Sequence, residues 1–357
     1  MSADKFERLK KYYKGRRVFV TGHTGFKGSW LCVLLKELGA EVYGYALKPE
    51  GESLFEIPGV ADSVVSSFND IRDMEALKKA YDEAKASAVL HLAAQPIVRT
   101  SYELPRDTYE INVMGTVNLL ECVRESGRET SVLNVTTDKV YYNPELADHA
   151  FKENEMLDGF DPYSNSKSCS ELVTHSYFNA FFKESNRVKL STARAGNVIG
   201  GGDFAKDRIV PDCYRAFAAG EPVLLRNPGS TRPFQHVLEP LVAYLWIVMA
   251  QDLNAALSGW YNVGPDERDA ITAGRIAEMF AAEWGEGAEL KDVSEAGAPH
   301  EAAYLKLDNS KLKTTFDLKP VWNIGEAVRK TARWYKTYHE GGDAVALMKD
   351  QIDEYFG

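Results

Sequence analysis

The fold of this chain is decided by the stretch Val18-Phe19-Val20-Thr21-Gly22-His23-Thr24-Gly25-Phe26-Lys27-Gly28. It begins as a short apolar run typical of a buried strand, and its glycines then recur at every third position where a helix is expected to begin. Glycine lets the backbone turn tightly and approach a phosphate, whose negative charge is favoured by the N–H groups and dipole at a helix start. A glycine-rich turn without a ligand has the same spacing. The stretch alone therefore predicts a strand, a tight turn and a helix, with phosphate binding as a hypothesis.

Residues 17–200 continue this alternation of short apolar runs and amphipathic stretches. The expected strands are 17–21, 41–46, 63–67, 88–92, 132–136 and 188–194. The expected helices are 26–38, 73–84, 106–126 and 162–182. Strands and helices that alternate in this way predict an α/β fold, a Rossmann-type doubly wound parallel sheet with helices on both faces.

From residue 200 onward, glycine and proline become more frequent and the expected strands become shorter. Strands are expected at 223–226 and 260–263, and helices at 236–251, 272–284 and 324–339. We therefore expect a dinucleotide-binding domain over residues 1–200, to which some later segments return. Residues 201–357 are expected to form a smaller mixed α/β lobe that binds the substrate. Residues 48–60 are expected to be a long surface loop.

The 357 residues are 45% hydrophobic and 26% charged, which is ordinary for a globular protein. The net charge of -10 and the scattered lysines and arginines argue against nucleic-acid binding. No apolar run approaches the roughly 18 residues of a membrane span, and the amino terminus lacks a signal-peptide stretch, so we expect a cytoplasmic protein without membrane contact. Single cysteines at 32, 122, 169 and 213 show no metal-ligand spacing, so we expect reduced core thiols and no metal site.

A second motif consists of Tyr163 and Lys167, which lie on the helix expected to begin at Pro162. Residues four apart on a helix project from the same face. A lysine charge nearby lowers a tyrosine pKa from about 10 toward the working pH. Such a tyrosine can remove a hydroxyl proton during hydride transfer. The glycine turn and this pair together predict a nicotinamide oxidoreductase.

Polar residues stand where the fifth expected strand ends. Thr137, Asp138 and Lys139 follow this strand directly. They would lie at the carboxyl edge of the sheet, where doubly wound folds bind ligands. The alternative is an ordinary turn in which Asp138 hydrogen-bonds its own backbone. We expect these residues to belong to an active site, because loops at this edge often carry catalytic groups.

The cofactor end of the motif departs from the usual pattern. The segment after the second strand, Tyr45-Ala46-Leu47-Lys48, lacks the acid that normally binds the adenosine ribose. Asp70 and Ile71 are candidates for adenine contact, although Asp70 could instead cap the following helix. His23 would either crowd a bound diphosphate or, when protonated, attract it.

Several strings occur in the order used by extended short-chain dehydrogenases/reductases. They are Gly22-x-x-Gly25-x-x-Gly28, Leu92-Ala93-Ala94-Gln95, Asn112-Val113-x-Gly115-Thr116, Tyr163-x-x-x-Lys167 and Arg194-Ala195-Gly196-Asn197-Val198. The chain resembles that family over nearly its whole length. Longer strings, such as Thr136-Thr137-Asp138-Lys139-Val140-Tyr141 and Arg232-Pro233-Phe234-Gln235-His236, resemble the CDP-glucose 4,6-dehydratases within it. Phe234 stands where that group usually has tryptophan.

The resemblance implies NAD as a cofactor that is regenerated in each turnover. The candidate cofactor contacts are Gly22, His23, Thr24, Gly25, Phe26, Lys27, Gly28, Asp70, Ile71, Leu92, Ala93, Ala94, Thr136, Tyr163 and Lys167. It also implies that Tyr163, with Lys167 and Thr137, oxidises a sugar at C4, and that protonated Asp138 assists loss of the 6-hydroxyl as water. The hydride then returns to C6. Lys139 would be either the base at C5 or a cation that stabilises the C5 enolate.

The implied substrate is a nucleotide sugar, CDP-glucose, used in deoxysugar synthesis for surface polysaccharides such as lipopolysaccharide O-antigen. Arg208 and Arg232 are candidates for its diphosphate because a guanidinium fork matches phosphate oxygens, the alternative being ordinary salt bridges. The other candidate substrate contacts are Gln95, Arg99, Ser101, Asn197, His300 and Tyr304.

Three alternatives stay open from the sequence. A nucleotide-sugar 4-epimerase would share Tyr163 and Lys167 but would need no acid at Asp138. A dehydratase of another nucleotide sugar would use the same residues. A cofactor-sensing binding protein would keep the fold without turnover, but it would be expected to lose the tyrosine and lysine.

The resemblance also implies a homodimer, or a higher oligomer, through a four-helix contact of residues 106–126 and 162–182.

Overall fold

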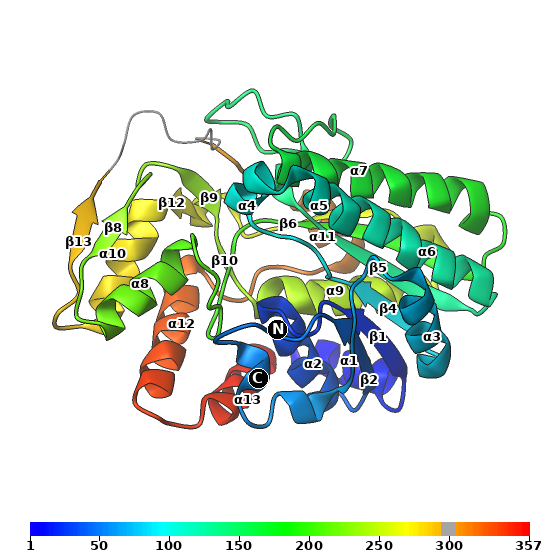
Figure 1. Cartoon of the computed structure of the whole chain (residues 1–357), viewed down its shortest axis with the longest axis horizontal. Coiled ribbons are helices and arrows are strands. Elements are labelled where there is room, and N and C mark those ends of the chain that lie inside the picture. Colours follow the sequence, from blue (N-terminus) through cyan, green and yellow to red (C-terminus); the bar gives the residue numbers. More distant parts are fainter. Residues whose placement is uncertain (294–303) are drawn as a thin grey trace.

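The computed structural model describes residues 1–293 and 304–357 (Figure 1). Its strands are β1 Arg17–Thr21, β2 Glu41–Ala46, β3 Val65–Phe68, β4 Ala88–His91, β5 Thr130–Thr137, β6 Val188–Ala195, β7 Val198–Ile199, β8 Val223–Leu225, β9 Thr231–Pro233, β10 Gln235–His236, β11 Trp260–Val263, β12 Ala270–Thr272 and β13 Leu290–Asp292. Its helices are α1 Ala3–Tyr13, α2 Phe26–Glu37, α3 Met74–Ala84, α4 Val98–Glu103, α5 Pro105–Tyr109, α6 Gly115–Ser126, α7 Pro162–Tyr177, α8 Ile209–Ala218, α9 Leu238–Leu253, α10 Ala273–Trp284, α11 Ser310–Phe316, α12 Ile324–His339 and α13 Ala344–Phe356.

Seven of the described strands form one parallel sheet in the order β11-β6-β5-β4-β1-β2-β3. The chain runs outward from β1 to β3 and then returns to the other side of β1 with β4. This reversal between β1 and β4 creates a crevice at the carboxyl ends of the strands, where such sheets bind ligands. The predicted doubly wound α/β fold is confirmed.

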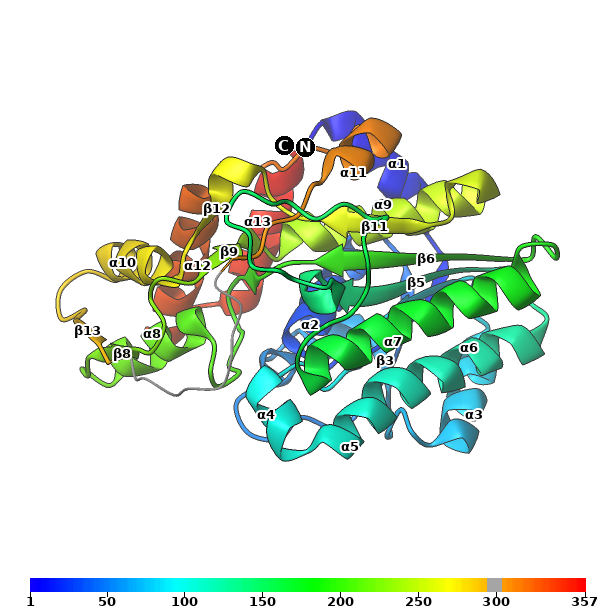
Figure 2. The same cartoon turned by 90° about the horizontal axis from the view of Figure 1, so that it is seen from above.

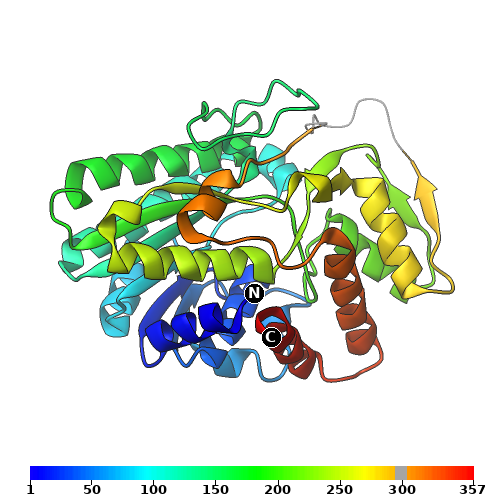
Figure 3. The same ribbon diagram turned by 180° about the vertical axis from the view of Figure 1, so that it is seen from behind.

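Helices cover both faces of this sheet, because its central strands are buried on both sides. Every residue of β4 and β5 is buried. On one face lie α3, α6 and α7, and on the other lie α2 and α9, with α1 packed against α9. Figure 2 shows α7 and α9 on opposite sides of the sheet. The mainly apolar α9 crosses that second face (Figure 3). In the described part of the chain, no helix combines the length and the apolar character that a bilayer crossing requires.

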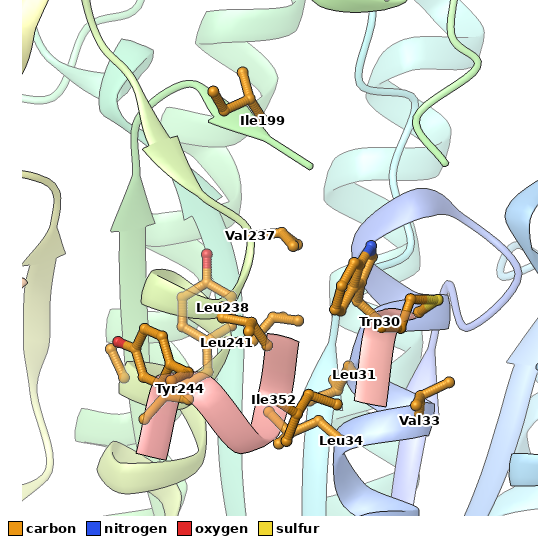
Figure 4. Packing of buried hydrophobic residues seen from close by; sticks show 14 of the residues in the cluster. Trp30, Leu31, Val33, Leu34, Ile199, Val237, Leu238, Leu241, Tyr244 and Ile352 are labelled. Atoms are coloured by element: carbon orange, nitrogen blue, oxygen red, sulfur yellow. The ribbon is translucent and has the colours of Figure 1, made fainter. Parts of the chain in front are cut away.

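The larger core joins distant parts of the chain. Trp30 and Leu34 of α2 pack near Leu238 and Leu241 of α9 and near Ile352 of α13 (Figure 4). The two termini also meet, since the amino group of Met1 donates to the carbonyl of Tyr355 at 2.6 Å. The last helix therefore holds the glycine-turn helix α2 in place from the carboxyl end of the chain.

A smaller lobe contains α8, α10 and the upper part of α12 beside the short pairs β8–β13 and β9–β12 (Figure 1). Other late segments join the large sheet. β11 pairs with β6, and α9 packs on β5 and β6. Residues 201–357 thus contribute to both parts, and the division of the chain at residue 200 stays a prediction.

Some expected elements have different limits or were missed. β3 begins two residues later than expected, and residues 110–114 and 178–182 are π-helical turns inside the two long helices. The expected surface loop at 48–60 contains a short 3-10 helix whose Leu54 and Phe55 are buried, so that expectation is corrected. Helices α1, α4, α8, α11 and α13 were not expected. Of the cysteines, Cys169 is only partly buried, while the other three lie in the core and all four are free thiols.

Candidate functional site

A cavity of about 360 Å³ lies at the carboxyl ends of β5 and β6 and is lined by residues from the large sheet and from the smaller lobe. The predicted site residues that line it are Phe26, Lys27, Arg99, Thr136, Thr137, Asp138, Lys139, Tyr163, Asn197, Arg208 and Arg232. They come from segments far apart in the sequence. Because parallel strands all end at the same edge, the topology brings these residues into one site.

The glycine turn is packed too closely for any side chain at two of its positions. Gly22 has φ +74°, and a Cβ there would lie 2.7 Å from the backbone nitrogen of Ala93. A Cβ at Gly28 would lie 2.1 Å from the carbonyl oxygen of Gly22. Gly25 is the N-cap of α2 and has no side chain to cap the first turn. The first N–H groups of α2 are therefore suited to the pyrophosphate of a dinucleotide.

The same turn is joined to neighbouring strand ends. The hydroxyl of Thr24 donates to the carbonyl of Leu47 at 2.9 Å, and the N–H of Ala93 donates to the hydroxyl of Thr21 at 3.2 Å. Leu92, Ala93 and Ala94 are partly buried and follow β4 directly. The predicted cofactor residues after β1 and β4 are thus neighbours.

His23 points away from solvent and is neutral at ordinary pH. Its ring is fully buried, and its Nε2 lies 3.0 Å from the hydroxyl of Ser66. Burial lowers the pKa of His23 to about 4. The ring fills the space beside Gly44, where a Cβ would lie 2.3 Å from the His23 Cγ. The idea that a protonated His23 attracts a diphosphate is therefore corrected, because the ring is held uncharged beneath β2 and β3.

Asp70 is already engaged within the protein. Its carboxylate accepts hydrogen bonds from the Arg72 guanidinium at 2.7 and 3.1 Å and from the Arg72 backbone N–H at 2.9 Å. Helix α3, which follows Asp70, is capped by Asp73 and not by Asp70. Ile71 is buried, and a Cβ at Gly115 would meet its side chain at 2.8 Å.

Tyr163 enters the cavity from the first turn of α7. Asp161 caps this helix by accepting from the Ser164 N–H at 3.0 Å, and Pro162 occupies its first position. Burial raises the pKa of Tyr163 to about 12, while hydrogen bonding to Thr137 and the charge of Arg208 act in the opposite direction. The expected lowering of the Tyr163 pKa is therefore corrected for this structure, because the cost of burying a phenolate outweighs its neighbours.

Lys167 is buried beneath the site and donates to the carbonyl of Val135 at 3.2 Å. Burial and the like charge of Lys27 lower the pKa of Lys167 to about 7, although Glu171 acts to raise it. A lysine with this pKa exchanges its proton near neutral pH, unlike an exposed lysine.

Glu171 and Arg194 form a fully buried ion pair behind Lys167. Their side chains are 2.9 Å apart, and the hydroxyls of Thr136 and Thr192 also donate to the Glu171 carboxylate. Burial alone would raise the pKa of Glu171, but Arg194 and the other donors lower it to about 2. Sequence reasoning missed this pair. The available signal was the position of Glu171, one turn beyond Lys167 on the same helix face.

Asp138 is buried at the end of β5 with one oxygen still able to accept a hydrogen bond. The hydroxyl of Thr137 donates to its Oδ1 at 2.9 Å, and Oδ2 has no hydrogen-bond partner among the described residues. Burial raises the pKa of Asp138 against the opposing charges of Lys139 and Arg232. This shift makes Asp138 easier to protonate than an exposed aspartate, which suits a group that donates a proton.

Two predicted phosphate ligands line the cavity from different segments. Arg208 pairs with Asp203 at 2.8 Å, so the salt-bridge alternative describes one of its contacts. Arg232 is almost wholly buried, and its Nη1 donates to the carbonyl of Thr231 at 2.9 Å. Both guanidinium groups belong to the cavity wall.

Three other predicted substrate contacts do not line the cavity in the described residues. The side chain of Gln95 donates to Thr108 at 3.0 Å and accepts from the Ile97 N–H. Ser101 is fully buried and donates to a carbonyl within α4, so it stabilises that helix. Tyr304 is 40% exposed beside β9. His300 lies outside the described residues.

Sequence reasoning also missed several residues that line the cavity, namely Asp203, Asp207, Asp212 and Arg226. Asp203 lies directly after a glycine run, and Arg226 begins an Arg-Asn-Pro string. Neither pattern indicates that the residue would line a cavity. Among the described residues, no group of His, Cys, Asp or Glu side chains is placed to hold a metal ion.

A doubly wound sheet with a glycine turn before its first helix, and with a tyrosine–lysine pair on a helix at the same crevice, defines the class of extended short-chain dehydrogenases/reductases. A family model described as GDP-mannose 4,6 dehydratase matches residues 19–331, and the chain belongs to this family.

Known proteins extend this likeness over the whole chain. A CDP-glucose 4,6-dehydratase from Salmonella typhimurium is 48% identical over 354 residues, which cover 97% of this chain and 98% of the relative. A UDP-glucose 4-epimerase from Thermus thermophilus, solved with NAD, is 26% identical with a TM-score of 0.78 over 90% of this chain and 99% of its own. A dTDP-glucose 4,6-dehydratase from Bacillus anthracis, also solved with NAD, shares the fold at 20% identity with a TM-score of 0.75, over 93% of this chain and 100% of its own.

Proposed function

We propose that this chain catalyses the NAD-dependent conversion of CDP-D-glucose to CDP-4-dehydro-6-deoxy-D-glucose, a loss of water. The observation that carries the proposal is the buried carboxyl group of Asp138, whose pKa is raised by burial, in the same cavity as Tyr163. An oxidation at C4 needs the tyrosine, whereas an elimination needs the acid as well. The choice of CDP-glucose is supported by the Salmonella typhimurium relative, which is 48% identical over nearly the full length of both chains.

The residues of the glycine turn fit NAD. Gly22, Gly25 and the first turn of α2 would hold its pyrophosphate, and Leu92, Ala93 and Ala94 would lie beside it. The segment after β2 offers no carboxylate to the adenosine ribose, and Asp70 is occupied by Arg72. NAD, when bound, supplies the reversible oxidation that acts first at C4 and then in reverse at C6.

The first proton leaves the 4-hydroxyl of the hexose and is accepted by Tyr163. Because burial favours the phenol, the charges around the phenolic oxygen must be arranged to favour proton acceptance during the reaction. Thr137 and Arg208 act in that direction. Lys167 follows four residues later and can release or take up a proton near neutral pH.

Elimination then uses the acid and the lysine that follow β5. The ketone at C4 makes the hydrogen on C5 acidic, so a proton leaves C5 as the C6–O bond breaks. Asp138 gives its proton to the departing hydroxyl, which leaves as water. Reduction at C6 and return of a proton to C5 complete the reaction with no net change of redox state.

Lys139 serves the C5 step in one of two ways. As a base, it must first lose its own proton. As a cation, it stabilises the negative charge of the enolate. Arginine keeps the charge and is not deprotonated in proteins, so the Lys139→Arg variant separates the two roles. Retained exchange of the C5 hydrogen with solvent would assign the cationic role, and its loss would assign the basic one.

The proposal is tested by incubating the purified protein and NAD with CDP-, UDP-, dTDP- and GDP-linked hexoses. We expect CDP-glucose to lose one water by mass spectrometry and to form a product with the ultraviolet absorbance of a 4-keto-6-deoxy sugar in alkali. Interconversion of glucose and galactose configurations without loss of water would instead support the 4-epimerase. Absence of turnover with every sugar, together with measurable NAD binding, would support the cofactor-sensing alternative.

We further propose a cytoplasmic homodimer that supplies deoxysugars for surface polysaccharides. Large apolar side chains are exposed along α5 to α7, namely Leu104, Tyr109, Met114, Leu172 and Phe181. A four-helix contact between two copies would cover them. Light scattering during size-exclusion chromatography should give the mass of two or more chains, and a monomer would refute this part of the proposal.

A further inference from the structure

The cavity extends from the reacting end to the smaller lobe. Tyr163 and Asp138 line it beside the large sheet, while residues 224–228, at the end of β8 and just after it, line it from the smaller lobe. β8 lies in the smaller lobe, on the far side from α7 (Figure 1). A nucleotide sugar is a linear chain of hexose, diphosphate, ribose and base. If the hexose lies at Tyr163 and the diphosphate at Arg208 and Arg232, as the proposed function requires, the base reaches the β8 end.

An acceptor and a donor stand side by side at this end. Arg226 Nη1 lies 2.6 Å from Asp207 Oδ1, and Arg226 Nη2 lies 3.6 Å from Asp212 Oδ2. Arg99, from the opposite side of the cavity, is 3.8 Å from the same Asp207 Oδ1. Asp207, Arg226 and Arg99 all line the cavity. Both Asp207 contacts with described residues use Oδ1, so Oδ2 can accept a further hydrogen bond.

The backbone supports a positioned carboxylate at residue 207. Asp207 has φ +62°, a left-handed conformation that residues other than glycine rarely adopt, although Asp and Asn tolerate it best. An exposed ion pair by itself contributes about 0–1 kcal/mol, which gives little reason to hold a residue in this conformation. Strain of this kind is concentrated at ligand sites.

We propose that Asp207 and Arg226 read the nucleobase and select cytosine over uracil and thymine. Cytosine presents an amino donor next to a ring-nitrogen acceptor, so Asp207 accepts from the amino group and Arg226 donates to the ring nitrogen. Uracil and thymine present the reverse order, an acceptor carbonyl next to an N–H donor. They would place a carbonyl against the carboxylate and an N–H against the guanidinium. Each mismatch of this kind sets a polar group of the base against a like group of the protein, which makes the pair a specificity device.

The test measures binding of CDP and UDP to wild type and to the Asp207→Asn variant by calorimetry, alongside turnover of CDP-glucose and UDP-glucose. Asparagine is the matched change because it tolerates the left-handed backbone and its amide can present either an acceptor or a donor. We expect wild type to prefer CDP, and the CDP-to-UDP preference to fall about tenfold to a hundredfold in the variant. The control is Glu278→Gln, which removes one carboxylate of an exposed pair with Arg275 at 2.8 Å on α10.

The outcomes separate this inference from the proposed function. An unchanged CDP-to-UDP preference in Asp207→Asn, or an equal change in Glu278→Gln, would overturn the reading of the base. So would tighter binding of UDP, GDP or ADP than of CDP to wild type. If wild type prefers CDP through Asp207 but removes no water from CDP-glucose, the base assignment stands and the proposed dehydration fails.

Discussion

Replacement of Asp138 by asparagine isolates the step that distinguishes a dehydratase from an epimerase. Asp138 is 1% exposed, and burial raises its pKa, so the neutral acid forms more readily here than in an exposed aspartate. The amide has nearly the same shape and can still accept from the Thr137 hydroxyl, a bond of 2.9 Å in wild type. We therefore expect a change in the free energy of unfolding below about 1 kcal/mol.

The catalytic effect should be much larger. A positioned acid contributes about a hundredfold to ten-thousandfold to rate, which corresponds to about 3–5 kcal/mol of barrier. The assay follows water loss from CDP-glucose by mass spectrometry and, in the same sample, reduction of NAD by absorbance. We expect the rate of water loss to fall by this factor. Oxidation of the sugar at C4, seen as reduction of NAD, should remain measurable. Turnover within about tenfold of wild type would refute the assignment of Asp138 as the proton donor.

Three further predictions concern other parts of the site. Gly28→Ala would place a Cβ 2.1 Å from the Gly22 oxygen, and it should weaken NAD binding by more than about tenfold in a fluorescence titration. The control Gly25→Ala, whose nearest contact lies at 3.5 Å, should weaken NAD binding less. Equal effects of the two variants would contradict this prediction. Lys139→Met should abolish exchange of the C5 hydrogen with solvent and spare C4 oxidation, and full turnover would remove Lys139 from the mechanism. Burial lowers the pKa of Lys167 from 10.5 to about 7, so between these pH values the unfolded chain binds one more proton than the folded chain. The free energy of unfolding, measured in urea, should therefore rise more steeply from pH 7 to 10.5 in wild type than in Lys167→Met. Parallel pH profiles for the two proteins would refute the buried-lysine argument.

Local sequence patterns predicted the elements that carry most of the site. The strands at 17–21, 41–46 and 260–263 and the helix at 324–339 have the limits expected from periodicity. Caps account for part of this accuracy, since Asp161 begins α7 and Asn323 forms a capping box with Glu326 at the start of α12. The short strands β9, β10 and β12 escaped prediction because two or three residues carry no periodic signal.

The contacts in the cavity wall could not be predicted from the sequence, because they join segments that lie far apart along the chain. Arg226 and Asp207 meet across 19 positions of the chain, and Arg99 approaches the same carboxylate from α4. The ion pair of Glu171 with Arg194 likewise joins α7 to β6. Salt-bridge partners of this kind leave no local pattern, because either residue would be equally acceptable on a solvated surface.

The order of residues by itself determined the strand–turn–helix that opens the chain, the doubly wound class of the sheet, and the segments whose carboxyl ends would meet. These follow from steric preferences and hydrophobic spacing, which act over a few neighbouring residues. Tertiary packing decided how the pKa values of the groups at that edge are shifted. It raised the pKa values of Tyr163 and Asp138 and lowered that of Lys167. The reason is that removal of water from an ionisable group depends on every segment packed around it, and those segments come from the whole length of the chain.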